Sequence, residues 1–383
     1  MPGPAIVLLS LFPSLVLSLA PASPRQEVAA PRCAECGGAG LLPCPAHRAA
    51  DLDPARRATY CRTAAGCATC AGAEWLDCPA CAGGAAEAWL AARAAEAPAA
   101  AERAAEIEKE LGRPLRIAES SHFLLVCELA PRKLGRTKLD EHGLLHAWLD
   151  RLESLFADYC ACLGAREEEF GARSWVLLWQ ERADHDAAGE EYCGWTWEQP
   201  WLYQRGARSR FSLHAGDKRY RDDADLHRTV VHHVVHGIMN QQKPAAWTGD
   251  SPDAWADVGL AHWFEDRLFG RADVACASEV EPALPRADKW RATVRKLAAA
   301  GKAPPIEALE PKKTGELTGD EHALAFAWID FLMATDPAQL NVLLQRFRAR
   351  TPIRDAIQEI YGWKLPALDA AWRAWVLASY AGR

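Results

Sequence analysis

The spacing of apolar positions predicts strands and a helix in the first half of the main domain, and helices in the second. Phe123–Leu129 and Ser174–Trp179 are short apolar runs typical of buried strands, and Ser209–His214 predicts a further strand. Leu144–Leu163 repeats its apolar residues at helical spacing. Three later segments have the same helical spacing: 321–333, 340–347 and 368–380. This order predicts an α+β fold.

The N-terminus carries a separate apolar run that predicts export. Ala5–Ala20 is apolar except for serines and Pro13, and it is short for a span that needs about 20 residues. The small residues around Ala20 and Ala22 fit signal peptidase. We therefore expect a signal peptide over residues 1–22, a secreted or cell-envelope protein, and no stable membrane span after removal of the signal. An uncleaved anchor is the alternative.

A cysteine-rich repeat follows the export signal. The chain has 13 cysteines, and most of those between residues 33 and 81 fall into two units of equal spacing, offset by 34 residues. The first unit is Cys33, Cys36, Cys44 and His47, and the second is Cys67, Cys70, Cys78 and Cys81. Cys-x2-Cys hooks of this kind can place soft ligands tetrahedrally around Zn²⁺. The exchange of His47 for Cys81 at the equivalent place favours a metal over a disulfide.

This repeat resembles the cysteine-rich repeats of DnaJ-type chaperones and small zinc ribbons over about fifty residues. The resemblance implies a rigid, metal-stapled module and no chaperone activity. A disulfide framework is the alternative, since export favours it. Cys61 lies outside the repeat and is either a free thiol or a further ligand. Residues 33–82 are therefore predicted to be a tandem zinc-binding module, followed by a helical spacer over residues 83–113.

Two histidines four residues apart mark the candidate chemistry of the main domain. His232 and His236 lie in an apolar segment, and helical spacing would stack them on one face, where both reach one metal ion. The surrounding valines are β-branched, so a strand is the alternative by propensity alone. A second motif, Trp255–Glu265, begins about nineteen residues later.

Together the two motifs resemble gluzincin peptidases, in which an HExxH helix is followed by a W-x-x-E-G-x-A-x-[YW]-x-E helix. The resemblance extends over about Leu115–Tyr380. It implies a small mixed sheet with a central metal-site helix in residues 115–270, and an all-helical C-terminal part in residues 271–383. It also implies that the segment with His232 and His236 is a helix.

Two residues that the family's chemistry requires are replaced. The Glu of HExxH activates the zinc-bound water, and its position holds His233. The third zinc ligand is a Glu, and its position holds Val258, which cannot bind a metal. The family's oxyanion-binding Tyr corresponds loosely to His322. Because catalytic zinc normally has three protein ligands, the chain is predicted to be an inactive pseudopeptidase that binds a polypeptide or acts as a scaffold.

Two other functions stay open. An active zinc hydrolase would use His232 and His236, a rerouted third ligand such as Asp257 or His262, and His233 or Glu265 as base. A purely structural envelope protein would bind no ligand. If the chain is a pseudopeptidase, His232, His233 and His236 can also be core histidines that bind no metal.

The remaining features change this picture little. A net charge of −7 gives no reason to expect nucleic acid as a partner. The group Trp195, Trp197 and Trp201 lies in a predicted loop and either packs there or binds a peptide or sugar. The other cysteines lack metal spacing and are expected to be buried thiols: Cys127, Cys160, Cys162, Cys193 and Cys276.

Overall fold

A computed structural model describes residues 33–36, 40–44, 59–64, 67, 69, 75–81, 85–135, 137–205, 208–242, 249, 253–274 and 289–380. The predicted signal segment lies outside these residues. Among them, no helix is both long and apolar enough to span a bilayer.

The body is built on a six-stranded mixed sheet with the strand order β2-β4-β5-β8-β10-β9. Its strands are β2 (Tyr60–Cys61), β4 (Ile117–Glu119), β5 (Phe123–Glu128), β8 (Ser174–Trp179), β9 (Trp201–Arg205) and β10 (Arg208–His214). β5, β8 and β10 run parallel, and the outer pairings are antiparallel. The strands predicted at all three apolar segments are confirmed.

Helices cover both faces of this sheet. α2 (Glu141–Leu163) and α4 (Asp223–Gln241) pack on one face, against side chains such as Leu125, Val176 and Phe211. α1 (Ala85–Glu110) and α3 (Arg182–Cys193) pack on the other face, against side chains such as Leu124 and Leu177. The alternation of side chains along each strand separates these two cores.

The predicted spacer is a helix, but it is part of the body. α1 continues through Pro98, and Ala100, Ala104 and Ile107 are buried against the sheet. The cysteine-rich segment also joins the sheet, because β2 adds to the edge at β4. Two shorter strands of that segment, β1 (Leu41–Pro43) and β3 (Trp75–Asp77), pair with each other.

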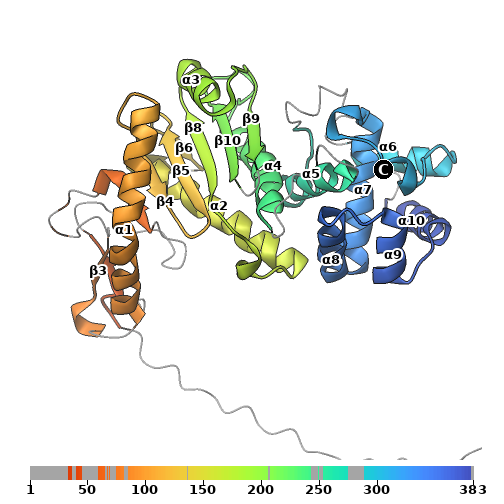
Figure 1. The fold of residues 1–383 in the computed structure, drawn as a ribbon, viewed down its shortest axis with the longest axis horizontal. Coiled ribbons are helices and arrows are strands. Elements are labelled where there is room, and N and C mark those ends of the chain that lie inside the picture. The colour runs from red at the N-terminus through yellow and green to blue at the C-terminus, as the bar shows by residue number, and fades with distance from the viewer. Residues whose placement is uncertain are drawn as a thin grey trace, which may run out of the picture.

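The C-terminal half is helical, as predicted, and lies at the opposite end of the molecule from the cysteine-rich segment (Figure 1). Its helices are α5 (Ala254–Phe269), α6 (Trp290–Ala299), α7 (Gly319–Thr335), α8 (Pro337–Arg348), α9 (Ile353–Tyr361) and α10 (Leu365–Ser379). The chain is therefore α+β, with a small sheet and a helical C-terminal part. A separate small hairpin joins β6 (Arg132–Leu134) to β7 (Thr137–Leu139).

Side-chain caps fix where the site-bearing helices begin. Asp222 accepts a hydrogen bond from the amide of Asp225 at the start of α4, and Thr318 forms a capping box with Glu321 at the start of α7. Gly259 in α5 lies so close to α7 that a Cβ there would be 2.5 Å from the Ala325 carbonyl oxygen. The caps thus fix the first residues of α4 and α7, and the Gly259 contact shows that α5 packs closely on α7.

Candidate metal centres

The cysteine-rich segment brings hooks of the two repeat units together. Cys33 and Cys36 cluster with Cys78 and could bind a metal ion, with Sγ of Cys33 and Cys78 separated by 3.8 Å. Cys44 Sγ lies 4.0 Å from Cys67 Sγ. The Cys33–Cys36 hook of the first unit therefore faces Cys78 of the second unit, and Cys44 of the first unit faces Cys67 of the second. The sequence left this pairing open, and the antiparallel β1–β3 pair produces it.

Other predicted ligands of this segment lie beyond what the structure describes. His47 and Cys70 fall outside the described residues, and for Cys81 only the backbone, in a short 3-10 turn at Pro79–Cys81, is described. The Gly40 amide donates to Cys36 Sγ at 3.2 Å, a contact that stabilises a thiolate. The two sulfur separations are about twice an S–S bond length of 2.05 Å, so these pairs are not disulfides.

In the body, helix α4 carries the predicted histidine pair, which confirms the helix over the strand alternative. His232 Nε2 and His236 Nε2 are 3.3 Å apart, so the two rings turn these atoms toward a common point. His232 Nδ1 lies 2.6 Å from Glu265 Oε1, and His236 Nδ1 lies 2.9 Å from Asp257 Oδ1. A carboxylate on the far nitrogen is how metal-binding histidines are usually oriented.

The contacts extend from this pair to α7. Glu265 Oε1 also lies 2.9 Å from His262 Nδ1, and His262 Nε2 lies 3.1 Å from His322 Nδ1. We call Asp257, His236, His232, Glu265, His262 and His322 the histidine cluster; each of its members is at most 3% exposed. Each of these side chains is therefore buried in the part of the chain that the structure describes.

The electrostatics of the histidine cluster favour structure over proton transfer. Burial raises the pKa of Glu265, but the contacts with His232 and His262 outweigh it and lower that pKa to about 2. A general base near neutral pH works best with a pKa close to the operating pH. Glu265 is therefore a fixed anion that accepts from two histidines.

His233 and Val258, which the sequence predicts to stand where gluzincins have glutamates, are both packed in the interior. His233 is fully buried, its Nδ1 lies 2.8 Å from the carbonyl oxygen of Thr229, and its ring stacks on Phe211. Val258 is fully buried in the apolar core. Within the described residues, His232 forms a possible metal-binding group with His262 and Glu265, and no such group contains both His232 and His236.

No protein-family model and no curated protein matches the chain.

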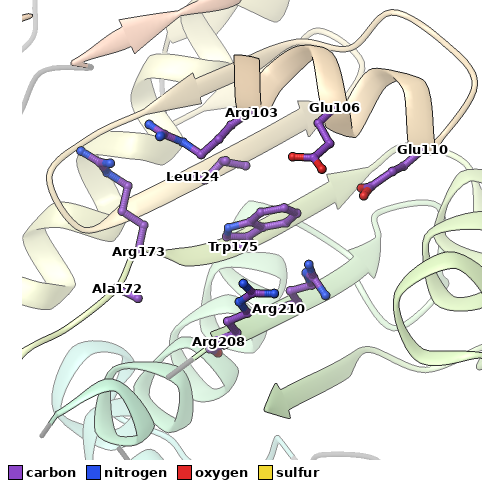
Figure 2. Close-up of a pocket in the computed structure, with 10 residues that line it drawn as sticks. Arg103, Glu106, Glu110, Leu124, Ala172, Arg173, Trp175, Arg208 and Arg210 are labelled. Atoms are coloured by element: carbon purple, nitrogen blue, oxygen red, sulfur yellow. The ribbon is translucent and has the colours of Figure 1, made fainter. Parts of the chain in front are cut away.

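A cavity of about 420 Å³ lies between α1 and the sheet, on the face opposite to α4. Figure 2 shows Arg103, Glu106 and Glu110 reaching into it from α1, and Arg208 and Arg210 from β10, with Trp175 between them. The remaining lining residues are Leu124, Ala172, Arg173 and Ser209.

The arginines of this cavity differ in how they are held. Arg103 and Arg173 both contact Glu119, at 2.6 and 3.5 Å. The Arg210 guanidinium lies 4.5 Å from the ring centroids of Trp175 and Tyr192. Arg208 is exposed at the mouth of the cavity. Four arginines and two glutamates line the cavity, but Arg173 also pairs with Glu96, and Glu119 is shared with Arg103. The positive charge available to a ligand therefore comes mainly from Arg208 and Arg210.

The residues that line this cavity were not predicted from the sequence. The sequence does carry a signal, because side chains alternate between the two faces of a strand. This alternation places Arg208 and Arg210 on the same face of β10, and Trp175 lies on the neighbouring strand β8. It could not be read without knowing that β8 and β10 are neighbours and that α1 lies over them.

The tryptophan group divides between solvent and core. Trp195 and Trp197 are 45% and 43% exposed, whereas Trp201 is buried on β9. Trp195 packs edge-on against Tyr203, with ring centroids 6.1 Å apart. Because Trp195 and Trp197 are exposed on one loop, the binding of a peptide or sugar there stays a prediction.

The single cysteines of the body behave as buried or half-buried thiols. Burial raises the pKa of Cys127 and of Cys160 to about 12, and that of Cys193 to about 11. These thiols are therefore protonated and unreactive near neutral pH. Cys276 lies outside the described residues.

Proposed function

We propose that this chain is a non-hydrolytic binding protein with a gluzincin-like body, and that zinc holds its cysteine-rich module. The observation that carries the proposal is the histidine cluster. His232 and His236 keep the orientation of metal ligands and their carboxylate partners, while the third-ligand position is Val258 in the apolar core. His232 and His236 alone would bind zinc weakly, because stable sites use three or four protein ligands. In the other possible group, of His232 with His262 and Glu265, the carboxylate instead lies within hydrogen-bond distance of both imidazoles.

Zinc in the module is supported by the sulfur geometry. Two thiolates of a tetrahedral zinc site, each about 2.3 Å from the metal, stand about 3.8 Å apart. The Cys33–Cys78 and Cys44–Cys67 separations are 3.8 and 4.0 Å. His47, Cys70 and Cys81 are the proposed remaining ligands. Export through residues 1–22 remains part of the proposal, and a module that needs metal for its fold is compatible with it.

The proposed binding region is the arginine-lined cavity, and the proposed partner is a polypeptide with acidic side chains. Arg208 and Arg210 offer planar donors that fit carboxylates, and Trp175 supplies an apolar floor. The cavity lies on the other face of the sheet from the histidine cluster, so binding there does not involve His232 or His236.

Restoration of the family residues tests the proposed origin of the body. The double variant His233→Glu with Val258→Glu should hold one zinc ion more per chain than wild type, measured by elemental mass spectrometry. The matched control, His233→Glu with Val258→Gln, should gain none, because an amide is a poor zinc ligand. If the double variant is folded and gains no zinc, the proposed equivalence of α4 and α5 to the gluzincin helices is wrong.

Peptide titration tests the binding region. A fluorescent oligoglutamate should bind the full chain with an affinity that falls as salt rises, and oligolysine should not bind. Arg208→Ala with Arg210→Ala should weaken binding at least tenfold. Arg354→Ala, which removes an exposed arginine that pairs with Glu307 in the C-terminal half, is the control. Equal oligoglutamate binding by wild type and the cavity variant would refute the assignment.

A further inference from the structure

Cys61, the cysteine outside the repeat, lies beside two histidines of the body. It ends strand β2 and is fully buried, while His142 and His146 lie one turn apart at the start of α2. One potential ligand atom from each of the three residues lies within 4.8 Å of the other two. None of the three belongs to the cysteine repeat or to the histidine cluster.

The three side chains are held from two sides. β2 is fixed to the sheet by the pairing of Cys61 with Ala118, and the next residue, Arg62, forms an ion pair with Glu108 of α1 at 2.9 Å. On α2, helical spacing alone places His142 and His146 on one face, with ring centroids 4.6 Å apart.

Thr63 adds a polar contact at the same place. Its hydroxyl oxygen lies 3.2 Å from Cys61 Sγ and 3.2 Å from His142 Nδ1. A hydroxyl beside both a thiol and an imidazole is the kind of outer contact that orients metal ligands. The potential ligand atoms of Cys61, His142 and His146 therefore meet beside a polar hydroxyl group, at the edge of the apolar core between β2 and α2.

We propose that Cys61, His142 and His146 bind a zinc ion that is separate from those of the cysteine-rich module. One thiolate and two imidazoles suit a borderline-soft metal, and Zn²⁺ accepts both donor types in tetrahedral geometry. In such a site neighbouring ligand atoms are about 3–4 Å apart, which small side-chain rotations reach from the observed spacing.

The proposed site would have a mechanical role. Cys61 and His146 are buried and His142 is half-buried. With three protein ligands, a bound water molecule would complete the tetrahedral set of the proposed ion. Because Cys61 comes from the cysteine-rich segment and the histidines from α2, the ion would tie β2 to the body. The site would thus couple the position of the module to the sheet.

Zinc analysis of full-length variants tests this site. Cys61→Ser and His142→Ala should each hold one zinc ion per chain fewer than wild type, after purification under reducing conditions. Cys193→Ser, at a half-buried cysteine of the body, is the matched control and should keep the wild-type content. His142→Ala removes a half-buried side chain and is expected to fold, which circular dichroism checks.

Cobalt substitution gives a second reading. The spectrum of wild type minus that of Cys61→Ser should contain a sulfur-to-cobalt charge-transfer band and the bands of tetrahedral Co²⁺. If both variants are folded and match wild type in zinc and cobalt, the site is refuted, and Cys61 is a buried thiol beside Thr63. Loss of copper in place of zinc would overturn the choice of metal. Failure of the module's zinc sites would lower all variants equally and leave the difference intact.

Discussion

Asp253 begins helix α5 in a left-handed backbone conformation, with φ of 78°, and its side chain is 4% exposed. Its amide donates to the Glu310 carbonyl oxygen at 2.9 Å. Burial and the nearby Glu310 carboxylate raise the pKa of Asp253 to about 7, against the opposing effects of Trp255 and Arg350. This carboxyl group is therefore largely protonated in the folded protein under mildly acidic conditions.

The raised pKa makes stability depend on pH at this residue. Between about pH 4 and pH 7 the folded state keeps a proton that the unfolded state has lost, so the free energy of unfolding falls as the pH rises. Asp253→Asn removes that penalty and tolerates the same backbone conformation. Urea unfolding should find the variant more stable than wild type at about pH 8 and similar to it at about pH 4. An equal difference at both pH values would contradict this account.

Only some members of the histidine cluster could be predicted from the sequence. His232 and His236 could be predicted because their spacing is local to one helix. Asp257, His262 and Glu265 were considered as ligands or bases, but their contacts follow from how α5 packs on α4. Glu265 is instead shared between two histidines, which lowers its pKa and fixes it as an acceptor.

At the scale of elements, α5 and α7 pack unusually closely at Gly259. A Cβ at this position would lie 2.5 Å from the Ala325 carbonyl oxygen and 2.8 Å from a side-chain carbon of Ile329. Gly259→Ala should therefore destabilise the protein by about 1–3 kcal/mol, as overpacking does, although Ala favours helices. Thermal unfolding measures this change. A variant more stable than wild type would contradict this prediction, because it would show that α5 and α7 can move apart without a loss of stability.

The elements themselves were largely predictable from sequence periodicity. The buried strands β5, β8 and β10 and the C-terminal helices follow local patterns. Propensity alone left α4 undecided between helix and strand, because its valines are β-branched; the observed helix is buried among other helices and the sheet. The pairing of β2 with β4, the cross-unit pairing of cysteine hooks and the meeting of Cys61 with His142 join distant segments, which no local pattern reports.

At the scale of the whole molecule, the two ends differ in what stabilises them. The cysteine-rich segment has few buried apolar side chains among its described residues, while the body has two extended apolar cores. The proposed metal ions therefore matter most for the fold of the segment.

A chelator under reducing conditions should unfold the cysteine-rich segment and leave the body folded. Hydrogen exchange should accelerate by at least tenfold in β1 and β3, since their pairing depends on the proposed metal sites. Exchange in β5 and β8 should stay slow, because both strands are buried in the sheet. Fast exchange throughout the chain would show that the body also depends on metal.

We propose that the histidine cluster holds no catalytic metal. The most direct measurement compares the zinc content of the full-length wild type with that of the His232→Ala, His236→Ala double variant, each assayed in parallel for peptide hydrolysis. We expect equal zinc content and no hydrolysis by either protein. One zinc ion fewer in a folded double variant, together with hydrolysis by wild type that the variant loses, would contradict it and establish an active metallopeptidase.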